Sequence, residues 1–108
     1  MMATILTNDP VLGRFREALG EVYGSRLERV VLYGSRARGD ARPDSDYDVA
    51  VFLRDTNDLG AELHRLADLS TGIIEETGEF VHAMSYRAGA YDERTPLMLE
   101  IRTDGVDL

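Results

Sequence analysis

The chain contains no cysteine, and this absence limits the chemistry open to it. Disulfide bonds and thiolate metal sites are excluded, so a reducing compartment is permitted. No stretch reaches the roughly 20 apolar residues that a membrane-spanning helix needs. The segment from Met1 to Leu12 lacks a basic flank followed by a long apolar run. We therefore expect a cytoplasmic protein without a membrane partner.

Basic side chains are scarce relative to acidic ones. Twelve lysine and arginine residues stand against 20 aspartate and glutamate residues, which gives a formal net charge of -8. A protein that follows a long nucleic acid needs a basic face that displaces counterions from the phosphates. The charge balance therefore disfavours a long nucleic acid as substrate.

Repeats, linkers and low-complexity segments are also missing from the 108 residues. The hydrophobic fraction of 44% and the charged fraction of 30% are ordinary for a soluble globular chain. A chain of this length can form one hydrophobic core. We predict a single domain over residues 1–108.

What the chain does have is a dense polar stretch between two apolar runs, from Val30 to Leu53. Its second run begins with Asp46 and Asp48. Side chains two positions apart on a strand share one face and lie about 6.5–7 Å apart, so these carboxylates project together. They repel each other unless a cation lies between them, and Mg²⁺ accepts a few carboxylates together with water and substrate phosphate. Asp46 and Asp48 are therefore candidate metal ligands and catalytic residues.

The first run of this stretch ends at Gly34 and Ser35. Glycine lets the backbone approach a phosphate closely. A serine hydroxyl and the following amides, at the start of a helical turn, offer donors to negative charge. Together with the two aspartates, this pattern predicts a site for a nucleoside triphosphate and a metal ion. The alternative is that Asp46 belongs only to an aspartate-rich turn.

Three arginines, Arg36, Arg38 and Arg42, lie in the loop between the two runs and reverse the local charge. Guanidinium groups bind phosphates well, so Arg36 and Arg38 are candidate nucleotide-binding residues beside Gly34 and Ser35. The alternative is a solvated loop in which the arginines pair with nearby acids such as Asp40 or Asp44. Both interpretations remain open at this point.

The spacing of these residues resembles a known signature. Gly34-Ser35, ten further residues and Asp46-Tyr47-Asp48 are similar to the motif of the polymerase-beta-like nucleotidyltransferase superfamily. The flanking residues and the short length resemble the minimal nucleotidyltransferases (MNT), which serve as antitoxins beside HEPN-domain toxins. The resemblance implies an α/β (α+β) fold with a small mixed sheet flanked by helices. It also implies transfer of AMP from ATP, with Mg²⁺, to a tyrosine of a cognate HEPN toxin. A homo-oligomer is left open.

The rest of the chain is expected to hold this site in place. Apolar spacing and caps predict a lead-in over residues 1–8 and six elements: helix 10–23, strand 26–33, strand 47–53, helix 58–76, strand 79–87 and helix 96–103. In the last helix we expect Leu97, Met98 and Ile101 to point inward. The apolar residues whose helical spacing marks the first two helices are Val11, Leu12, Phe15, Leu19, Val22, Tyr23, Leu59, Leu63, Leu66, Ile73 and Ile74.

One position departs from the superfamily pattern, which has a third carboxylate on the strand after the long helix. His82 stands there. A neutral imidazole is a poor ligand for Mg²⁺, but it accepts a proton near neutral pH, so His82 is a candidate general base or favours Mn²⁺. It can equally be a histidine that binds nothing. Glu79 is a second candidate, on the opposite face by alternation, and His64 is expected at the surface.

Three functions therefore stay open. The first is an adenylyl-transferring enzyme that acts on a toxin. The second is a catalytically impaired antitoxin that neutralises its toxin by binding alone, its acidic surface meeting a basic partner. The third is a nucleotidyltransferase of small molecules, which usually carries an extra helical domain.

Overall fold

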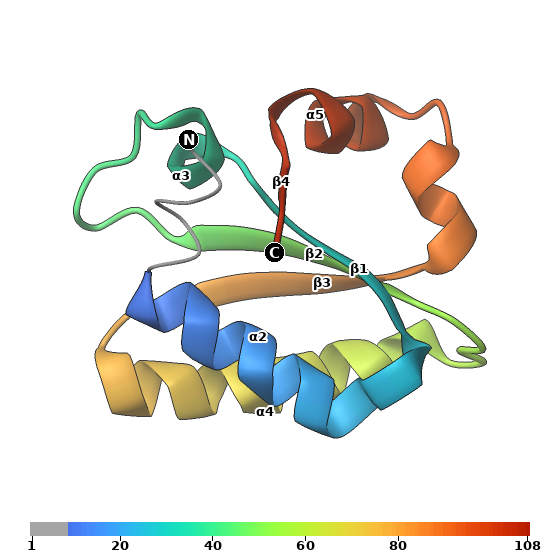
Figure 1. The fold of residues 1–108 in the computed structure, drawn as a ribbon, viewed down its shortest axis with the longest axis horizontal. Coiled ribbons are helices and arrows are strands. Elements are labelled where there is room, and N and C mark those ends of the chain that lie inside the picture. Colours follow the sequence, from blue (N-terminus) through green and yellow to red (C-terminus); the bar gives the residue numbers. More distant parts are fainter. Residues whose placement is uncertain (1–8) are drawn as a thin grey trace.

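A four-stranded mixed sheet carries the polar stretch (Figure 1). The structure, a computed structural model, describes residues 9–108, so the lead-in predicted over residues 1–8 lies outside it. The strand order is β3-β2-β1-β4. β1 is antiparallel to both β2 and β4, whereas β2 and β3 are parallel. The strands are β1 (Leu27–Tyr33), β2 (Tyr47–Leu53), β3 (Val81–Arg87) and β4 (Val106–Asp107).

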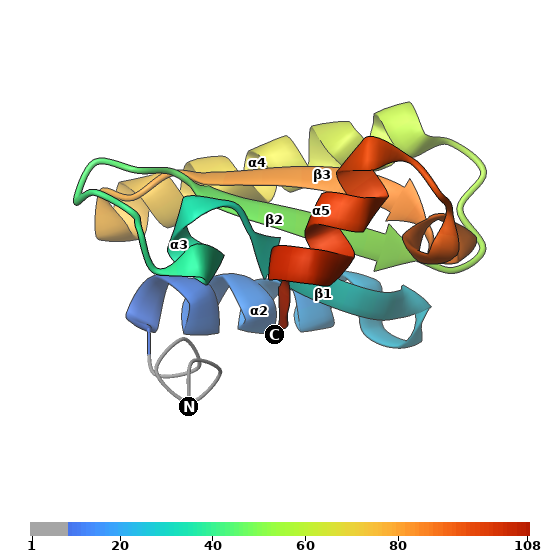
Figure 2. The same cartoon turned by 90° about the horizontal axis from the view of Figure 1, so that it is seen from above.

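Helices cover both faces of this sheet, which confirms the predicted fold class (Figures 1 and 2). α2 (Pro10–Tyr23) and α4 (Leu59–Thr77) lie on one face. α5 (Pro96–Asp104) and the 3₁₀ turn η2 (Ala88–Asp92) lie on the other. Two short turns complete the chain, η1 (Gly24–Arg26) before β1 and α3 (Ser35–Arg38) after it. The helix α4 connects β2 to β3, as parallel neighbours require.

The predicted caps start and stop the long helices. Asp9 accepts hydrogen bonds from the N–H groups of Val11 and Leu12, at 2.8 and 3.3 Å. Asp58 accepts from the N–H of Ala61 at 3.1 Å, and α4 ends at Gly78 with φ of 78°. These side chains satisfy backbone groups that have no partner inside the helix.

Two hydrophobic clusters hold the layers together, one on each face of the sheet. β2 contributes to both of them, because Val49 and Val51 face α2 and α4 while Ala50 and Phe52 face α5 and η2. β1 is likewise buried on both faces and lies between β2 and β4, as the apolar run from Val30 to Leu32 predicted. Side-chain packing on both faces of the sheet therefore holds β2 in place.

Some details of the helix patterns were wrong. Leu97 was predicted to point inward but is 37% exposed, and Val22, Leu63 and Ile74, which belong to the apolar patterns, are between 39% and 42% exposed. In α4 the reason is the orientation of the helix, whose buried side follows Glu62, Leu66, Ser70 and Ile73. Leu63 and Ile74 each lie one residue, about 100° of rotation, away from that side.

Three short elements, η1, η2 and β4, were not predicted. Val106 and Asp107 pair with β1 as β4, and Tyr91 of η2 packs edge-on against Phe52. Within residues 9–108, no helix has the length and apolar character to cross a membrane. The extent of the domain over residues 1–108 stays a prediction.

Candidate active site

Three polar side chains form a row across neighbouring strands. In the register of the sheet, Asp48 of β2 lies opposite Tyr33 of β1 and beside His82 of β3. Residues paired in this way share one face of the sheet. The Nδ1 atom of His82 lies 3.6 Å from Oδ1 of Asp48, and their side chains are 53% and 34% exposed. The row therefore opens to solvent and can receive a ligand.

Gly34 brings the turn that follows β1 against the carboxylate of Asp48. Its φ of 75° and ψ of -158° are a conformation that only glycine adopts readily. A Cβ atom built at this position would lie 2.6 Å from Oδ2 of Asp48, so any larger residue would displace the carboxylate. The structure thus brings Gly34, Asp48 and His82 together.

α3 begins directly after Gly34 and is a single helical turn. The N–H groups of Ala37 and Arg38 both donate to the carbonyl of Gly34 at 3.1 Å, and that of Gly39 donates to Ser35 at 3.0 Å. The N–H groups of Ser35 and Arg36 precede these bonds, so they lie at the open start of the turn. Ser35 is half-buried at the same end.

Arg36 holds the loop that leads to the aspartates. Its Nε and Nη2 atoms donate to the carbonyl of Ser45 at 3.0 and 2.7 Å. Its guanidinium carbon lies 4.0 Å from the ring centroid of Tyr47, and Glu79 forms an ion pair at 3.9 Å. These contacts are those of a residue that positions the loop, so the role of Arg36 in nucleotide binding stays a prediction.

The remaining predicted residues lie at the surface around this row. Arg38 is exposed and forms three ion pairs, with Asp40 at 3.3 Å, Asp104 at 3.6 Å and Glu100 at 3.9 Å. The hydrogen bond that Arg38 donates to the carboxylate of Asp40 raises the pKa of Arg38 above its usual value. Asp46 is exposed and directly precedes β2, and among residues 9–108 no hydrogen bond or ion pair holds its carboxylate.

Two tyrosines border the site and stay neutral, Tyr47, which is buried, and Tyr33, which is half-buried. Burial raises the pKa of Tyr47 to about 12, and the hydrogen bond that its hydroxyl donates to Asp9 at 2.8 Å adds to this. Burial also raises the pKa of Tyr33 to about 12, with smaller contributions from Tyr86 and Asp48. Tyr33 was missed as a site residue, because its position opposite Asp48 depends on strand register.

The donor set fits a metal ion that is shared with a substrate. Within the described part of the chain, no group of three or more histidine, cysteine or acidic side chains gathers closely enough to enclose a cation. Two carboxylates with solvent access suit Mg²⁺, which retains water and phosphate ligands. Asp48 is accessible in this way, and Gly34 leaves space beside its carboxylate. His82 lies beside Asp48, and its place as the counterpart of a third carboxylate stays a prediction.

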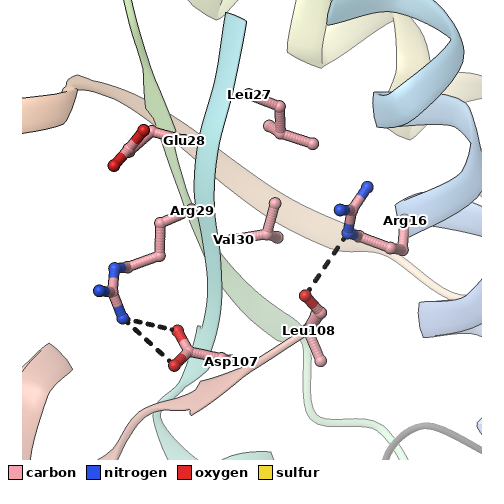
Figure 3. A pocket seen from close by; sticks show the side chains of 7 residues that line it. All are labelled: Arg16, Leu27, Glu28, Arg29, Val30, Asp107 and Leu108. Atoms are coloured by element: carbon pink, nitrogen blue, oxygen red, sulfur yellow. Dashed lines mark hydrogen bonds and ion pairs between the residues drawn. The ribbon is translucent and has the colours of Figure 1, made fainter. Parts of the chain in front are cut away.

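A separate hollow of about 270 Å³ lies at the other end of the sheet, beside β1 and β4 (Figure 3). Arg29 donates to Asp107 at 3.0 Å across its mouth, and Arg16 donates to the carbonyl of Leu108 at 3.5 Å. None of its lining residues belongs to the row of Tyr33, Asp48 and His82. The site on β2 and β3 is therefore distinct from this hollow.

Comparisons with known proteins identify the family of this chain. The family model of the nucleotidyltransferase domain matches residues 12–92. A protein of Methanocaldococcus jannaschii that is named as a protein adenylyltransferase is 33% identical over 45 residues, which are 42% of this chain and 46% of that protein. The chain thus spans less than half the length of this curated relative.

Solved structures show the same fold. A nucleotidyltransferase structure from Sulfolobus solfataricus superposes with a TM-score of 0.63 at 20% identity, covering 99% of this chain and 86% of that one. A toxin-antitoxin structure with AMP-PNP gives 0.61 at 22% identity, covering 86% and 68%. A toxin-antitoxin MntA-HpeT variant, in which two aspartates two positions apart are replaced by glutamate, gives 0.60 at 21% identity, covering 85% and 68%.

The family model covers most of the chain, from α2 to η2, and includes the row on β1, β2 and β3. The match also extends over Gly34, the turn after it and both aspartates. This chain belongs to the nucleotidyltransferase domain family.

Proposed function

We propose that the protein is an antitoxin that transfers AMP from ATP to a tyrosine of a cognate HEPN toxin in the cytoplasm. The observation that carries this proposal is the close approach of Gly34 to the carboxylate of Asp48. It brings a phosphate-binding turn and a metal-binding acid to one point. An enzyme that transfers a nucleotide needs both in contact with the same triphosphate.

Each residue of the site has a role in this reaction. Asp46 and Asp48 would hold Mg²⁺, or Mn²⁺, which when bound neutralises the charge on the phosphates. The turn at Gly34 and Ser35 receives those phosphates, and Arg38 lies beside it. The acceptor oxygen forms a bond to the α-phosphorus, the bond from the α-phosphorus to the bridging oxygen breaks, and pyrophosphate leaves. His82 takes the proton of the acceptor hydroxyl.

The relatives support the class of reaction and of partner. One is named as a protein adenylyltransferase, and two solved neighbours are toxin-antitoxin structures, one of them with AMP-PNP. The two altered aspartates of the MntA-HpeT variant have the same spacing as Asp46 and Asp48. A protein acceptor therefore suits this chain better than a small molecule.

A second candidate function is neutralisation by binding alone. It is favoured by His82, which stands where a third carboxylate is expected, and by the absence of a cluster of three metal ligands within residues 9–108. In that case the chain keeps the fold and the partner but has lost efficient transfer. The two candidates predict different effects of removing the aspartates.

The deciding experiment combines labelled ATP, Mg²⁺ or Mn²⁺, and the toxin encoded beside this protein. We expect label on a toxin tyrosine, and loss of both the label and protection of cells in the double variant Asp46→Ala with Asp48→Ala. Asp44→Ala is the control, because Asp44 is an exposed acid of the same loop. Protection without label would establish binding alone, and the absence of label with either ion would exclude transfer to this toxin.

A further inference from the structure

β3 is an edge of the sheet, and among residues 9–108 no strand pairs with its outer side. On its inner side, the N–H of Tyr47 donates to the carbonyl of Phe80 at 3.1 Å. Parallel strands pair through the peptide groups of alternate residues, so His82 and Met84 direct their N–H and C=O groups toward β2. Val81 and Ala83 consequently direct theirs outward, where another strand could pair with them.

A groove of about 310 Å³ runs along this edge, between β3 and α4. One wall is α4, where Leu63 and Ala67 give a mainly apolar surface and Ser70 and Thr71 continue it by one turn. The other wall is the strand from Phe80 to Met84. Leu63, which the orientation of α4 leaves 39% exposed, is part of this wall.

The opposite edge of the sheet is protected in a way that β3 is not. There β4 covers part of β1, and the ion pair of Arg29 with Asp107 lies across the remainder (Figure 3). Charged side chains on an edge strand prevent pairing with other chains. Between Phe80 and Met84, His82 is the only side chain that can carry a charge.

We propose that this groove binds an extended segment of the acceptor protein, which adds to the sheet beside β3 and presents its tyrosine to the site. The inference rests on the proposed function and names its substrate class. His82 belongs both to the groove and to the row with Asp48, so a segment in the groove lies directly beside the reacting groups. Unpaired backbone groups of an edge strand select a strand as their partner.

The geometry of pairing also selects the acceptor side chain. A residue of the added strand opposite His82 has its side chain on the face of Asp48. Its backbone lies two strand spacings, about 9.5 Å, from that of Asp48. The short hydroxyls of serine and threonine stay above their own strand, whereas the phenol of tyrosine extends across His82 toward Asp48. The residues on either side of the tyrosine face α4, which favours apolar or small side chains there.

A binding experiment tests the groove without any chemistry. The probe is an eight-residue peptide of alternating valine and threonine with a central tyrosine, at millimolar concentration without ATP. Amide hydrogen exchange of Val81 and Ala83 should be fast in the free protein and slow at least threefold with the peptide, while that of His82 and Met84 stays slow throughout. Unchanged exchange at Val81 and Ala83 would overturn the groove, whatever the protein does with ATP.

A transfer experiment with the same peptide tests the consequence. Leu63→Asp should raise the KM for the peptide about tenfold with kcat retained, since it places a charge in the apolar wall. Leu97→Asp is the matched control, because Leu97 is 37% exposed against 39% for Leu63 but lies on α5, across the sheet. The peptide with serine in place of tyrosine should take at least tenfold less label.

The outcomes separate the two proposals. Slowed exchange without any transfer of label would leave the groove in place and count against the enzyme. Transfer to tyrosine that is equal in wild type, Leu63→Asp and Leu97→Asp would leave the enzyme in place and overturn the groove. A peptide with an N-methyl group on the amide that faces β3 should neither slow exchange nor take label, whereas methylation of the amide that faces away should have no effect.

Discussion

The close approach of the turn after β1 to Asp48 depends on Gly34. Two separate features require glycine here. The backbone has a positive φ, and a Cβ atom at this position would clash with Oδ2 of Asp48. A substitution therefore costs stability and disturbs the site at once. The two effects can be separated with another glycine of the same chain.

Gly34→Ala should lower the free energy of unfolding by about 1–3 kcal/mol, as expected for a disfavoured φ and ψ, and should abolish binding of ATP with Mg²⁺. Gly24→Ala is the control, because Gly24 also has a positive φ, 54°, but a Cβ there would have nothing within 4 Å. It should cost a similar amount of stability and leave binding unchanged. Urea unfolding and titration calorimetry measure the two quantities, and equal binding by both variants would contradict the role of Gly34.

Arg36 gives a second test at the same scale. If it positions the loop, Arg36→Met should lower the free energy of unfolding by about 1–3 kcal/mol, because two hydrogen bonds to the carbonyl of Ser45 are lost. Weaker binding of ATP would follow from a displaced Asp46. Arg42→Met, at an exposed position of the same loop, should change stability by less than about 0.5 kcal/mol. Normal stability of Arg36→Met with lost ATP affinity would instead show direct contact with the phosphates.

Tyr47 makes stability depend on alkaline pH. Its pKa in the folded protein is raised to about 12, above the ordinary value of 10.0. The folded state thus favours the neutral phenol, so its contribution is fully present below pH 10 and is lost as the pH rises toward 12. Tyr47→Phe should be about 1 kcal/mol less stable at pH 7, from the lost hydrogen bond to Asp9. Between pH 10 and 12 the variant should lose less stability than wild type, as urea unfolding across this range would show. The remaining loss comes from Tyr33, Tyr23 and Tyr86, whose pKa values are also raised.

At the scale of elements, α4 supplies an acidic residue to the buried side of a helix. Glu62 is 5% exposed and forms ion pairs with Arg26 and Arg65, the latter at 3.1 Å. Tyr23 lies under both guanidinium groups. This cluster ties the end of α2 and η1 to the start of α4, so it fixes the helix that aligns β3 with β2.

Glu62→Ala should lower the free energy of unfolding by about 2 kcal/mol, less than for a fully buried pair because both arginines are partly exposed. Glu75→Ala, an exposed acid of the same helix, should change it by less than about 0.5 kcal/mol. The midpoint of urea unfolding checks both values. Equal midpoints would show that the cluster adds nothing to the packing of α4.

The limits of prediction from sequence are also clearest at this scale. The long elements were predictable, because Asp9, Pro10, Asp58 and Gly78 are local signals that act on adjacent backbone groups. The orientation of α4 was not predictable, because an apolar stripe is broader than the side that becomes buried. The burial of Glu62 was not predictable either, because a charged residue is normally expected at the surface. β4 was not predictable, because two residues are too few to show the alternation of apolar and polar side chains that marks a strand. They form a strand only because β1 has an edge with which they can pair.

In the candidate site, too, local features were predictable from the sequence, whereas contacts between distant residues were not. Strand alternation predicted a paired projection of Asp46 and Asp48, and the motif placed Gly34 and Ser35 with them. The row of Tyr33, Asp48 and His82 depends on the pairing of residues far apart in the chain, which no local pattern encodes. The contact of Arg36 with Ser45 likewise depends on how the loop folds back.

At the scale of the whole molecule, the net charge of -8 bears on the partner. Most of the arginines in residues 9–108 form ion pairs with acids of the same chain, so the excess acids are left to the solvent. An antitoxin with this surface would attract a basic partner. We expect its association rate with the toxin to fall about tenfold between 0.05 and 0.5 M salt, with a nearly constant dissociation rate, as stopped-flow mixing would show. An association rate that does not change with salt would exclude electrostatic attraction.

The alignment of Tyr33, Asp48 and His82 on three adjacent strands also has a thermal consequence. These side chains hold their mutual positions through the backbone ladder of the sheet interior, and the ladder breaks only when the protein melts. The proposed transfer activity should therefore stay constant during gradual warming until the cooperative unfolding transition, and then disappear together with the folded structure.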